Sequence, residues 1–378
     1  MTIEDIAPIQ VSGSDVGDAE LAAVARVFDV GYLGMGAEVA AFESELTEFF
    51  GRPAVCVSTG TAALQLAVQA CGIGPGDEVI VPSFTYVASF QAISATGATP
   101  VAAEIDPVTL TVDPDDVRAR ITARTRAIMP VHYASGLADM EAISALADEH
   151  GLRVIEDAAH AFGTTSAHGL VGSYGDIACF SFDPIKNVTA GEGGCVVTDD
   201  EKVLERVRDA RLLGVIGDSR ARVKQTRLYQ YDVEEQGWRY HMSNIMASIG
   251  RTQLARFPKF AEKRRLLATR YQDQLANLPG VELIPLDYSH VVPHVFVIRL
   301  DTRETRDRVR QVLADEYRIG TAIHYHPNHV LTLYRVEGLG LPITDREAAR
   351  VLTIPLHTRM NDTDVDRVVG AIRTVLET

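Results

Sequence analysis

The sequence predicts an α/β fold with a large domain, in which a mixed, mostly parallel sheet lies between helices, and a smaller C-terminal α+β domain. First, seven short apolar runs between residues 53 and 199 are rich in β-branched residues and lack strict alternation, as strands covered on both faces do. Second, helix-like patterns separate several of these runs, and repeated strand-then-helix order is typical of layered α/β folds. Third, the pattern changes after about residue 250 to a long charged helix followed by mixed elements.

The elements of the large domain follow in chain order. The first strand passes directly into a helix over 60–72, in which apolar residues fall on one face. Ligands of parallel sheets bind beyond the carboxyl ends of the strands, so the residues that close each strand are the candidate site residues. The predicted strands cover residues 53–59, 77–83, 99–105, 125–131, 152–159, 176–182 and 193–199.

The C-terminal part begins with an amphipathic helix over 250–278 that is suited to linking two domains. A strand over 294–300 and helices over 305–317 and 364–377 follow it. A chain of 378 residues is also too long for one small core. We therefore predict an N-terminal segment and large domain over 1–250, and the linking helix with a small domain over 251–378.

Composition and charge narrow the class of protein. The chain has 36 basic and 51 acidic residues, a formal charge of −15, which argues against a nucleic-acid partner. The N-terminus has no basic region followed by an apolar run, and no stretch approaches the ~18 apolar residues of a membrane helix, so we expect a cytoplasmic protein. Four cysteines without C-x-x-C spacing predict buried, reduced thiols.

Lys186 is the first lysine of a chain that otherwise prefers arginine, and it follows the predicted strand 176–182. An arginine keeps its proton in proteins, whereas a desolvated lysine amine can lose it and attack a carbonyl. Its near neighbours Pro184, Ile185 and Val188 are not acidic. Lys186 is therefore a candidate nucleophile, and the alternative is an ordinary surface lysine in a loop.

Two adjacent acids, Glu156 and Asp157, stand near the end of the predicted strand 152–159. One of them should point into the site, where a protonated pyridine nitrogen would partner a buried carboxylate. The alternative is an aspartate that caps a following helix. His160 comes three residues later and reaches the same site if this segment is helical.

The turn at 58–61 joins the first strand to its helix and contains Gly60. Backbone N–H groups at a helix N-terminus favour a phosphate, and glycine allows close approach, while an ordinary helix cap is the alternative. Phe84 and Tyr86 follow the second strand, where an aromatic face can stack on a flat cofactor, although such aromatics more often belong to the core.

Two further motifs suggest chemistry that their spacing does not support. The stretch "HYHPNH" holds His324, His326 and His329, but without a helical i,i+4 pair, a cysteine or an evident carboxylate we expect no metal site. The stretch "GYLGMG" at 31–36 does not follow a strand in a βαβ unit, so its glycines are turn residues and Rossmann-type NAD binding is not expected.

Taken together, these segments resemble the DegT/DnrJ/EryC1/StrS family of pyridoxal-phosphate (PLP) aminotransferases, which have fold type I of PLP-dependent transferases. The resemblance covers nearly the whole chain and rests on many motifs in the right order. They are "GYLGMGAEVAAFE", "STGTAALQLAV", "GDEVIVPSFTYVAS", "VIEDAAHAFG", "SFDPIKNVTAGEGG", "YHMSNIMASIGRTQL", "IHYHPNHVLTLY" and "LPITDREAARVLTIPLH".

The resemblance implies a role for each candidate residue. Lys186 would bind the cofactor covalently, and Asp157 would pair with its pyridinium nitrogen. His160 would lie near the 3′-hydroxyl of the cofactor, and Tyr86 would stack on its ring. The phosphate would be held by Ser181, Gly60 and Thr61.

One position departs from the family pattern. Many members have "GxNYRM" where this chain has "GWRYHM", and their asparagine reaches the phosphate in the partner subunit of a homodimer. Arg239 takes that position here, and a guanidinium can also bind a phosphate. The motif "IHYHPNH" assigns His324, Tyr325 and His329 to substrate binding.

The resemblance implies transfer of an amino group from L-glutamate to a keto group of a nucleotide-linked deoxysugar, with the cofactor alternating between PLP and pyridoxamine phosphate (PMP). Relatives that dehydrate a sugar have histidine in place of the lysine, so Lys186 favours amination.

Two other functions are left open by the sequence. One is a keto-cyclitol aminotransferase that uses L-glutamine, and the other, more remote, is a non-catalytic regulatory relative. A cationic patch at the cleft mouth would favour a sugar nucleotide over a cyclitol. The candidate residues for such a patch are Arg211, Arg220, Arg222, Arg227 and Arg239.

Overall fold

The computed structural model describes residues 7–218 and 230–377 of the chain. The central sheet contains β1 (Ala54–Val57), β2 (Glu78–Pro82), β3 (Thr99–Ala103), β4 (Thr125–Ile128), β5 (Arg153–Asp157), β8 (Ile177–Ser181) and β9 (Gly194–Val197). Their order is β1-β9-β8-β5-β4-β2-β3. The pairs from β3 to β8 are parallel, and β9 runs antiparallel to β8 and β1. All seven predicted strands are confirmed.

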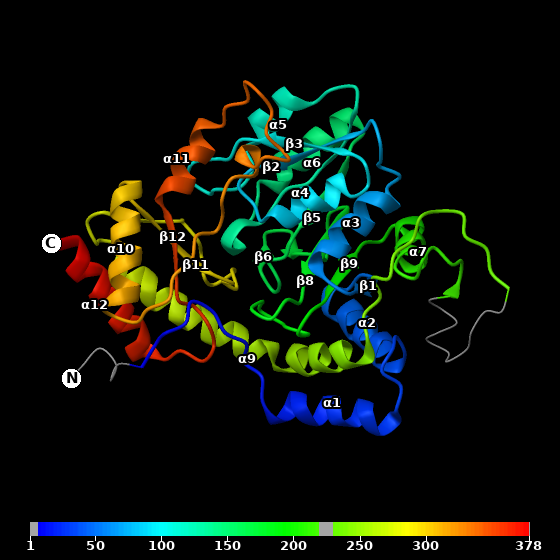
Figure 1. Cartoon of the computed structure of the whole chain (residues 1–378), viewed down its shortest axis with the longest axis horizontal. Coiled ribbons are helices and arrows are strands. Elements are labelled where there is room, and N and C mark those ends of the chain that lie inside the picture. Colours follow the sequence, from blue (N-terminus) through cyan, green and yellow to red (C-terminus); the bar gives the residue numbers. More distant parts are fainter. Residues whose placement is uncertain (1–6, 219–229, 378) are drawn as a thin grey trace.

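Helices cover both faces of this sheet (Figure 1), which explains why its strands are apolar on both sides. One face packs against α3 (Gly60–Ala70), α4 (Val87–Ser94) and α7 (Glu201–Ala210). The other face packs against α2 (Ala37–Phe50), α5 (Pro114–Arg120), α6 (Met140–His150) and the start of α9 (Asn244–Leu275). The glycine-rich stretch 31–36 is a turn between α1 (Asp18–Val30) and α2, as predicted.

A smaller antiparallel sheet lies at the other end of α9 (Figure 1). It consists of β10 (Val281–Leu283), β11 (Phe296–Leu300) and β12 (Val351–Ile354), and it packs with α10 (Arg303–Asp315), α12 (Asp362–Glu377) and the last turns of α9. Helix α9 begins at Asn244, earlier than the predicted residue 250, because the Ser243 hydroxyl accepts a hydrogen bond from Met246 N and caps its N-terminus. The predicted domain boundary at 250 stays a prediction.

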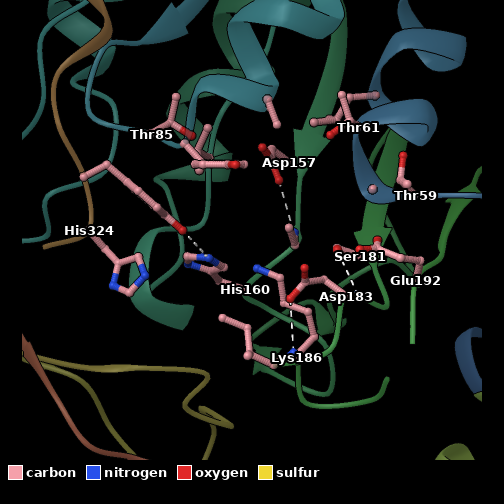
Figure 2. Close-up of a pocket in the computed structure, with 18 residues that line it drawn as sticks. Thr59, Thr61, Thr85, Asp157, His160, Ser181, Asp183, Lys186, Glu192 and His324 are labelled. Atoms are coloured by element: carbon pink, nitrogen blue, oxygen red, sulfur yellow. Dashed lines mark hydrogen bonds between the residues drawn. The ribbon is translucent and has the colours of Figure 1, made fainter. Parts of the chain in front are cut away.

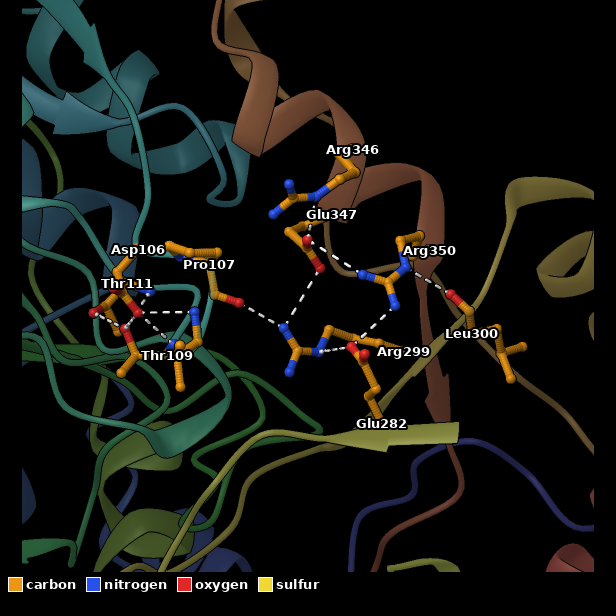
Figure 3. A network of polar contacts seen from close by, with 11 residues as sticks. Asp106, Pro107, Thr109, Thr111, Glu282, Arg299, Leu300, Arg346, Glu347 and Arg350 are labelled. Carbon is orange, nitrogen blue, oxygen red and sulfur yellow. Dashed lines mark hydrogen bonds and ion pairs between the residues drawn. The ribbon is translucent and has the colours of Figure 1, made fainter. Parts of the chain in front are cut away.

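Polar contacts join the small sheet to the loop that follows β3 (Figure 3). Arg299 of β11 donates to the Pro107 carbonyl at 2.5 Å and lies 3.6 Å from the Glu347 carboxylate on α11 (Pro342–Arg350). Glu104, at the end of β3, accepts hydrogen bonds from the first amides of α11. These contacts fix the small sheet against the large one. They also fix the position of the segment 316–341, which connects α10 to α11.

The remaining elements are short. They are β6 (Thr165–Ser166), β7 (Gly169–Leu170) and the 3-10 turns η2 (Tyr133–Ser135) and η3 (Asn328–Val330). All four cysteines are free thiols, and three of them, Cys56, Cys179 and Cys195, are buried in the large sheet. Across the ranges 7–218 and 230–377, no helix combines the length and the apolar character that crossing a membrane requires.

Candidate active site

The parallel strands end at one edge of the large sheet, and a cavity of about 450 Å³ opens there (Figure 2). The chain crosses this edge after β1, β2, β4, β5 and β8, as expected for a ligand site of a parallel sheet. Its lining residues are Thr59, Gly60, Thr61, Leu64, Thr85, Tyr86, Ala88, Val131, Asp157, Ala159, His160, Ser181, Asp183, Ile185, Lys186, Glu192, His324 and Tyr325.

Lys186 lies in the loop after β8, and its amine points into this cavity (Figure 2). The Nζ atom lies 3.4 Å from Nε2 of His294. Within the described residues, no carboxylate lies within ion-pair distance of Nζ. Burial lowers the pKa of Lys186 to about 8, although Asp183 and Asp157 act in the opposite direction. The amine is therefore a cavity group that can lose its proton near neutral pH, and not a surface lysine.

Asp157 closes β5 on the floor of the cavity and is only 6% exposed. Its carboxylate accepts hydrogen bonds from Ser89 Oγ at 2.7 Å and from the amide of Ala159 at 3.2 Å. No cationic side chain of the described chain forms an ion pair with it. A buried carboxylate requires a charged partner or strong donors, so Asp157 is suited to a cationic group of a ligand.

The segment Thr59 to Thr61 begins α3 at the opposite wall of the cavity. Thr59 Oγ1 accepts a hydrogen bond from Ala62 N at 3.0 Å, so the predicted helix cap exists. The first amides of the helix also point outward from its N-terminus. A Cβ atom on Gly60 would lie 2.7 Å from Cβ of Ser181, so only glycine lets the two segments approach this closely. One turn can therefore serve both as a helix cap and as an anion site.

His160 and Tyr325 form a hydrogen-bonded pair, with 2.8 Å between Nε2 and the phenol oxygen. Residues 159–163 form turns and not the helix that the prediction required, yet His160 still reaches the cavity. Burial, and then the charge of Lys186, hold the pKa of His160 well below its usual value. The same causes lower the pKa of His324 to about 4. Both rings are therefore neutral at pH 7.

Two predicted substrate or cofactor residues lie outside the cavity lining. The ring of His329 is buried, with Nδ1 2.8 Å from Ser83 Oγ and Nε2 3.3 Å from the Asp345 carboxylate. Arg239 is exposed and pairs with Leu212 in an isolated bridge. The roles of both residues stay predictions.

The structure also shows where most of the other candidates for a cationic patch or an aromatic stack lie. Arg211 is 1% exposed and lies 2.5 Å from Glu43, so it is a core ion pair and does not face the cleft. Arg220, Arg222 and Arg227 fall outside the described residues. Phe84 is buried against Tyr133 and is a core residue. Tyr86 is 59% exposed at the mouth of the cavity, with its ring centroid 5.7 Å from that of Tyr325.

Two histidines of the "HYHPNH" stretch have contacts of their own. Across 7–218 and 230–377, no three or more histidine, cysteine or acidic side chains come together as metal ligands. The Nδ1 atom of His324 lies 2.8 Å from Thr353 Oγ1, and His329 has the contacts described above.

Four residues of this site were not predicted from the sequence. Ser89 supports Asp157, His294 contacts Lys186, and Asp183 and Glu192 line the cavity. Asp183 and Glu192 stand within the motif that contains Lys186, so that motif could have indicated them. Ser89 ends the motif "GDEVIVPSFTYVAS", which could also have indicated it, although its partner Asp157 is 68 residues away. His294 is 108 residues from Lys186, and nothing in its local sequence marks it.

The donor set of the cavity fits PLP. A helix N-terminus approached closely by Ser181 suits the phosphate, a buried carboxylate without a cation suits the pyridinium nitrogen, and a lysine of lowered pKa suits the aldehyde. The Nδ1 atom of His160 has no hydrogen-bond partner within the described chain and is buried. These residues follow three separate strands, β1, β5 and β8, which is why they form one site only in the fold.

Comparisons with known proteins show related sequences and folds. The family model of the DegT/DnrJ/EryC1/StrS aminotransferases matches residues 14–373. The spore coat polysaccharide biosynthesis protein SpsC of Bacillus subtilis (strain 168) is 38% identical over 373 residues, 96% of this chain and 95% of SpsC. The structure of S. venezuelae DesV in complex with a ketimine intermediate is 39% identical and covers 95% of this chain and 94% of DesV, with a TM-score of 0.86.

The cofactor is present in solved relatives. Spr1654 from Streptococcus pneumoniae, solved in a PLP form and in a PMP form, is 29% identical with a TM-score of 0.89 and covers 98% of this chain and 98% to 99% of the other. The predicted fold type, enzyme class and cofactor are thereby confirmed. The chain belongs to the DegT/DnrJ/EryC1/StrS aminotransferase family.

Proposed function

We propose that this enzyme transfers the amino group of L-glutamate to a keto group of a nucleotide-linked deoxysugar, and that Lys186 binds the cofactor and moves the proton. The observation that carries the proposal is Lys186 itself. Its amine opens into the cavity with a pKa of about 8, close to the pH at which a general base works best. Asp157 lines the same cavity, and no cationic side chain of the described residues forms an ion pair with it.

The roles of the chain's own groups follow from their positions. When bound, the cofactor supplies an aldehyde that carries the amino group and a pyridine ring that delocalises negative charge. Asp157 keeps the ring nitrogen protonated, and Ser89 and the Ala159 amide orient its carboxylate. The amine of Lys186, once displaced by the donor, takes the proton from the donor's α-carbon and later returns a proton to the acceptor carbon.

The remaining residues of the cavity would bind the cofactor and orient the acceptor. The amides of Gly60 and Thr61, with the hydroxyl of Ser181, hold the phosphate at the N-terminus of α3. Neutral His160, fixed by Tyr325, would bind the 3′-hydroxyl. Tyr86, His324 and Tyr325 line the cavity, where they would contact the cofactor ring and the acceptor.

The sugar acceptor is supported by the relatives. SpsC is named for polysaccharide biosynthesis, and CalS13 of Micromonospora echinospora, 29% identical with a TM-score of 0.88, is titled a sugar aminotransferase. We extend this to dTDP-, UDP- or GDP-linked keto-sugars. The diphosphate then requires cations, for which Arg239 and the residues 220, 222 and 227 are candidates.

One observation favours the keto-cyclitol alternative with L-glutamine as donor. Among the described lining residues of the cavity, Lys186 is the one lysine or arginine, and it is accompanied by the carboxylates Asp157, Asp183 and Glu192. A cyclitol without phosphate would suit such a lining, whereas a diphosphate needs basic groups supplied from elsewhere.

We also propose a homodimer with shared sites. Large apolar side chains of α1 are exposed, with Leu21 at 69%, Phe28 at 59% and Val30 at 72%, and a second copy of the chain would cover them. A dimer would also bring Arg239 to the neighbouring site. Sedimentation analysis tests the dimer: a monomer at micromolar concentration would contradict it.

We also propose that the chain divides into two domains near residue 250. The separate apolar core of the small sheet supports this division.

Absorption spectroscopy tests the proposed function. PLP added to the enzyme should give a visible band that L-glutamate abolishes, and keto-sugar nucleotides should restore it. A band that responds to L-glutamine and keto-cyclitols instead would favour the alternative acceptor. A band that neither donor changes would contradict both functions. The Lys186→Ala variant serves as the control without the band.

A further inference from the structure

His294 is the side chain in contact with the amine of Lys186. It precedes β11, is 3% exposed, and directs Nε2 to within 3.4 Å of Nζ. Its ring also lies against that of His160, with 4.5 Å between the centroids. Lys186 and His294 are 108 residues apart in the sequence, so the segment before the small sheet brings a second imidazole to the site, beside that of His160.

The backbone of His294 is held from two sides. Its amide donates to Ser135 Oγ at 2.8 Å, and its carbonyl accepts from Nη1 of Arg264 at 3.0 Å. Ser135 in turn donates to the His160 carbonyl and adopts a φ of 72°, which non-glycine residues rarely accept. Such a conformation persists where the surrounding structure over-determines it, often at functional sites. The imidazole is therefore fixed in front of Nζ.

The ring of His294 is neutral. Burial, followed by the charges of Lys186 and other neighbours including Arg264, holds its pKa well below the usual value. Its Nδ1 atom is buried and has no hydrogen-bond partner in the described part of the chain. A neutral imidazole offers one acceptor nitrogen, and an ammonium at Nζ offers only donors, so Nε2 is the acceptor. The other titratable groups around Lys186 are Asp157, His160, Asp183 and His324.

We propose that His294 is a positioning residue that docks the free amine of Lys186: its Nε2 accepts a hydrogen bond from Nζ whenever Lys186 is not bound to the cofactor. The inference rests on the proposed function, in which Lys186 is released in each half of the reaction. The released amine then stays beside Nε2 of His294 and does not move freely in the cavity. Docking keeps the proton-bearing amine close to the carbon that receives the proton.

The docking predicts a change in the proton affinity of Lys186. An acceptor beside a buried ammonium stabilises the charged form, so its removal should lower the pKa of the amine. His294→Phe removes both ring nitrogens, and His294→Asn places an amide near the position of Nδ1. His294→Gln reaches the position of Nε2 and should rescue the contact. Comparing His294→Gln with His294→Asn therefore shows whether Nε2 or Nδ1 accepts the hydrogen bond from Lys186.

The first measurement uses cofactor-free enzyme. Brief labelling with acetic anhydride across a pH series, followed by mass spectrometry of the Lys186 peptide, gives the pKa of this amine. We expect the wild-type value in His294→Gln, and a fall of about one unit, tenfold in proton affinity, in His294→Phe and His294→Asn. The matched control is His290→Phe, because His290 is exposed and contacts Thr165 at the surface.

The second measurement uses the holoenzyme and α-deuterated L-glutamate. If docking positions the base, His294→Phe and His294→Asn should lower kcat and raise the deuterium isotope effect, with little change in the KM of the acceptor, and glutamine should restore part of kcat. An unchanged Lys186 titration in all three His294 variants would overturn the proposal, as would glutamine and asparagine variants that behave alike.

The two proposals fail separately. If His294→Phe does not fold, the glutamine and asparagine variants decide the question. Labelling of the cofactor-free enzyme does not depend on whether Lys186 binds PLP. An error in the proposed function would therefore appear in the absorption spectrum and in the holoenzyme kinetics, and would leave the labelling result unchanged.

Discussion

Glu156 and Asp157 are adjacent carboxylates at the end of β5, and they have different hydrogen-bond partners. Both are buried, at 0% and 6% exposure. Glu156 is not part of the cavity lining, and its Oε2 lies 2.9 Å from Nε2 of His132, which is also fully buried. Asp157 lines the cavity, and its donors among the described residues are neutral, Ser89 Oγ and the Ala159 amide.

The difference separates a structural acid from a functional one. Glu156 receives an ionisable partner for its Oε2 atom from the segment after β4, so the protein itself supplies a group that can pair with this carboxylate. Asp157 receives none from the described chain, and in our account the cofactor completes its environment. Exposure alone does not distinguish the two residues, whereas the chemical nature of their partners does.

The largest effect is expected at Lys186, the group that shares the cavity with Asp157. Lys186→Ala and Lys186→Arg should lower the rate of amino transfer by about a thousandfold or more, because arginine keeps its proton and alanine has no base. Steady-state kinetics with L-glutamate measure this loss. Lys202→Ala, on the exposed face of α7, is the matched control. Normal turnover in either Lys186 variant would show that another base operates.

Matched amides at the two carboxylates test the comparison directly. Asp157→Asn should lower kcat by about a hundredfold, because an amide cannot hold the charge of the ring nitrogen. Glu156→Gln should instead lower the free energy of unfolding by about 1–3 kcal/mol, because it weakens a buried pair.

Two measurements separate these outcomes. Kinetics per folded molecule should single out Asp157→Asn, and denaturant unfolding of the cofactor-free protein should single out Glu156→Gln. The reverse pattern would contradict our assignment of the two acids of β5.

The pH dependence of cofactor binding tests whether the pKa of the Lys186 amine is lowered. Only the unprotonated amine attacks an aldehyde, and the pKa of Lys186 is lowered to about 8. The rate of covalent PLP binding to cofactor-free enzyme should therefore rise about tenfold per pH unit below 8 and level off above it. Stopped-flow absorbance measures this rate. A rate still rising at the same slope up to pH 10 would mean an ordinary, solvated lysine.

A smaller effect is expected at the phosphate wall. Gly60→Ala places a Cβ atom 2.7 Å from Cβ of Ser181, and overpacking of about 1–3 kcal/mol should raise the Kd of PLP about tenfold. Gly340→Ala is the control, because no atom lies within 4 Å of its added Cβ. Equilibrium titration with PLP compares the two variants, and equal affinities would place the phosphate elsewhere.

The smallest effect is expected at Arg239, which is exposed in one copy of the chain. Arg239→Ala should weaken PLP binding by about threefold to tenfold if the guanidinium reaches the neighbouring phosphate, and Arg239→Asn should restore part of it. The same titration decides this. An Arg239→Ala enzyme with wild-type affinity would remove Arg239 from the site.

The sequence predicts the strands and the residues that close them, because buried parallel strands have apolar runs and their polar ends stand out. Lys186, Asp157 and the turn at Gly60 can therefore be recognised as candidates from the sequence alone. His294 cannot, since its role depends on the small sheet folding against the site. Ser89 stands in a recognisable motif, but its contact with Asp157 exists only once α4 packs at the edge of the large sheet. The sequence also cannot reveal that Arg211 is buried with Glu43, because an arginine outside a motif has the same local signature in a core and at a cleft.

Peptide mapping after borohydride reduction tests the central claim most directly. Reduction fixes PLP to the lysine that holds it, and the chain has five lysines, at 186, 202, 224, 259 and 263. We predict that the reduced cofactor is found on the Lys186 peptide alone, at one per chain. Cofactor on any other lysine, or none on Lys186, would contradict the assignment of this cavity as the active site.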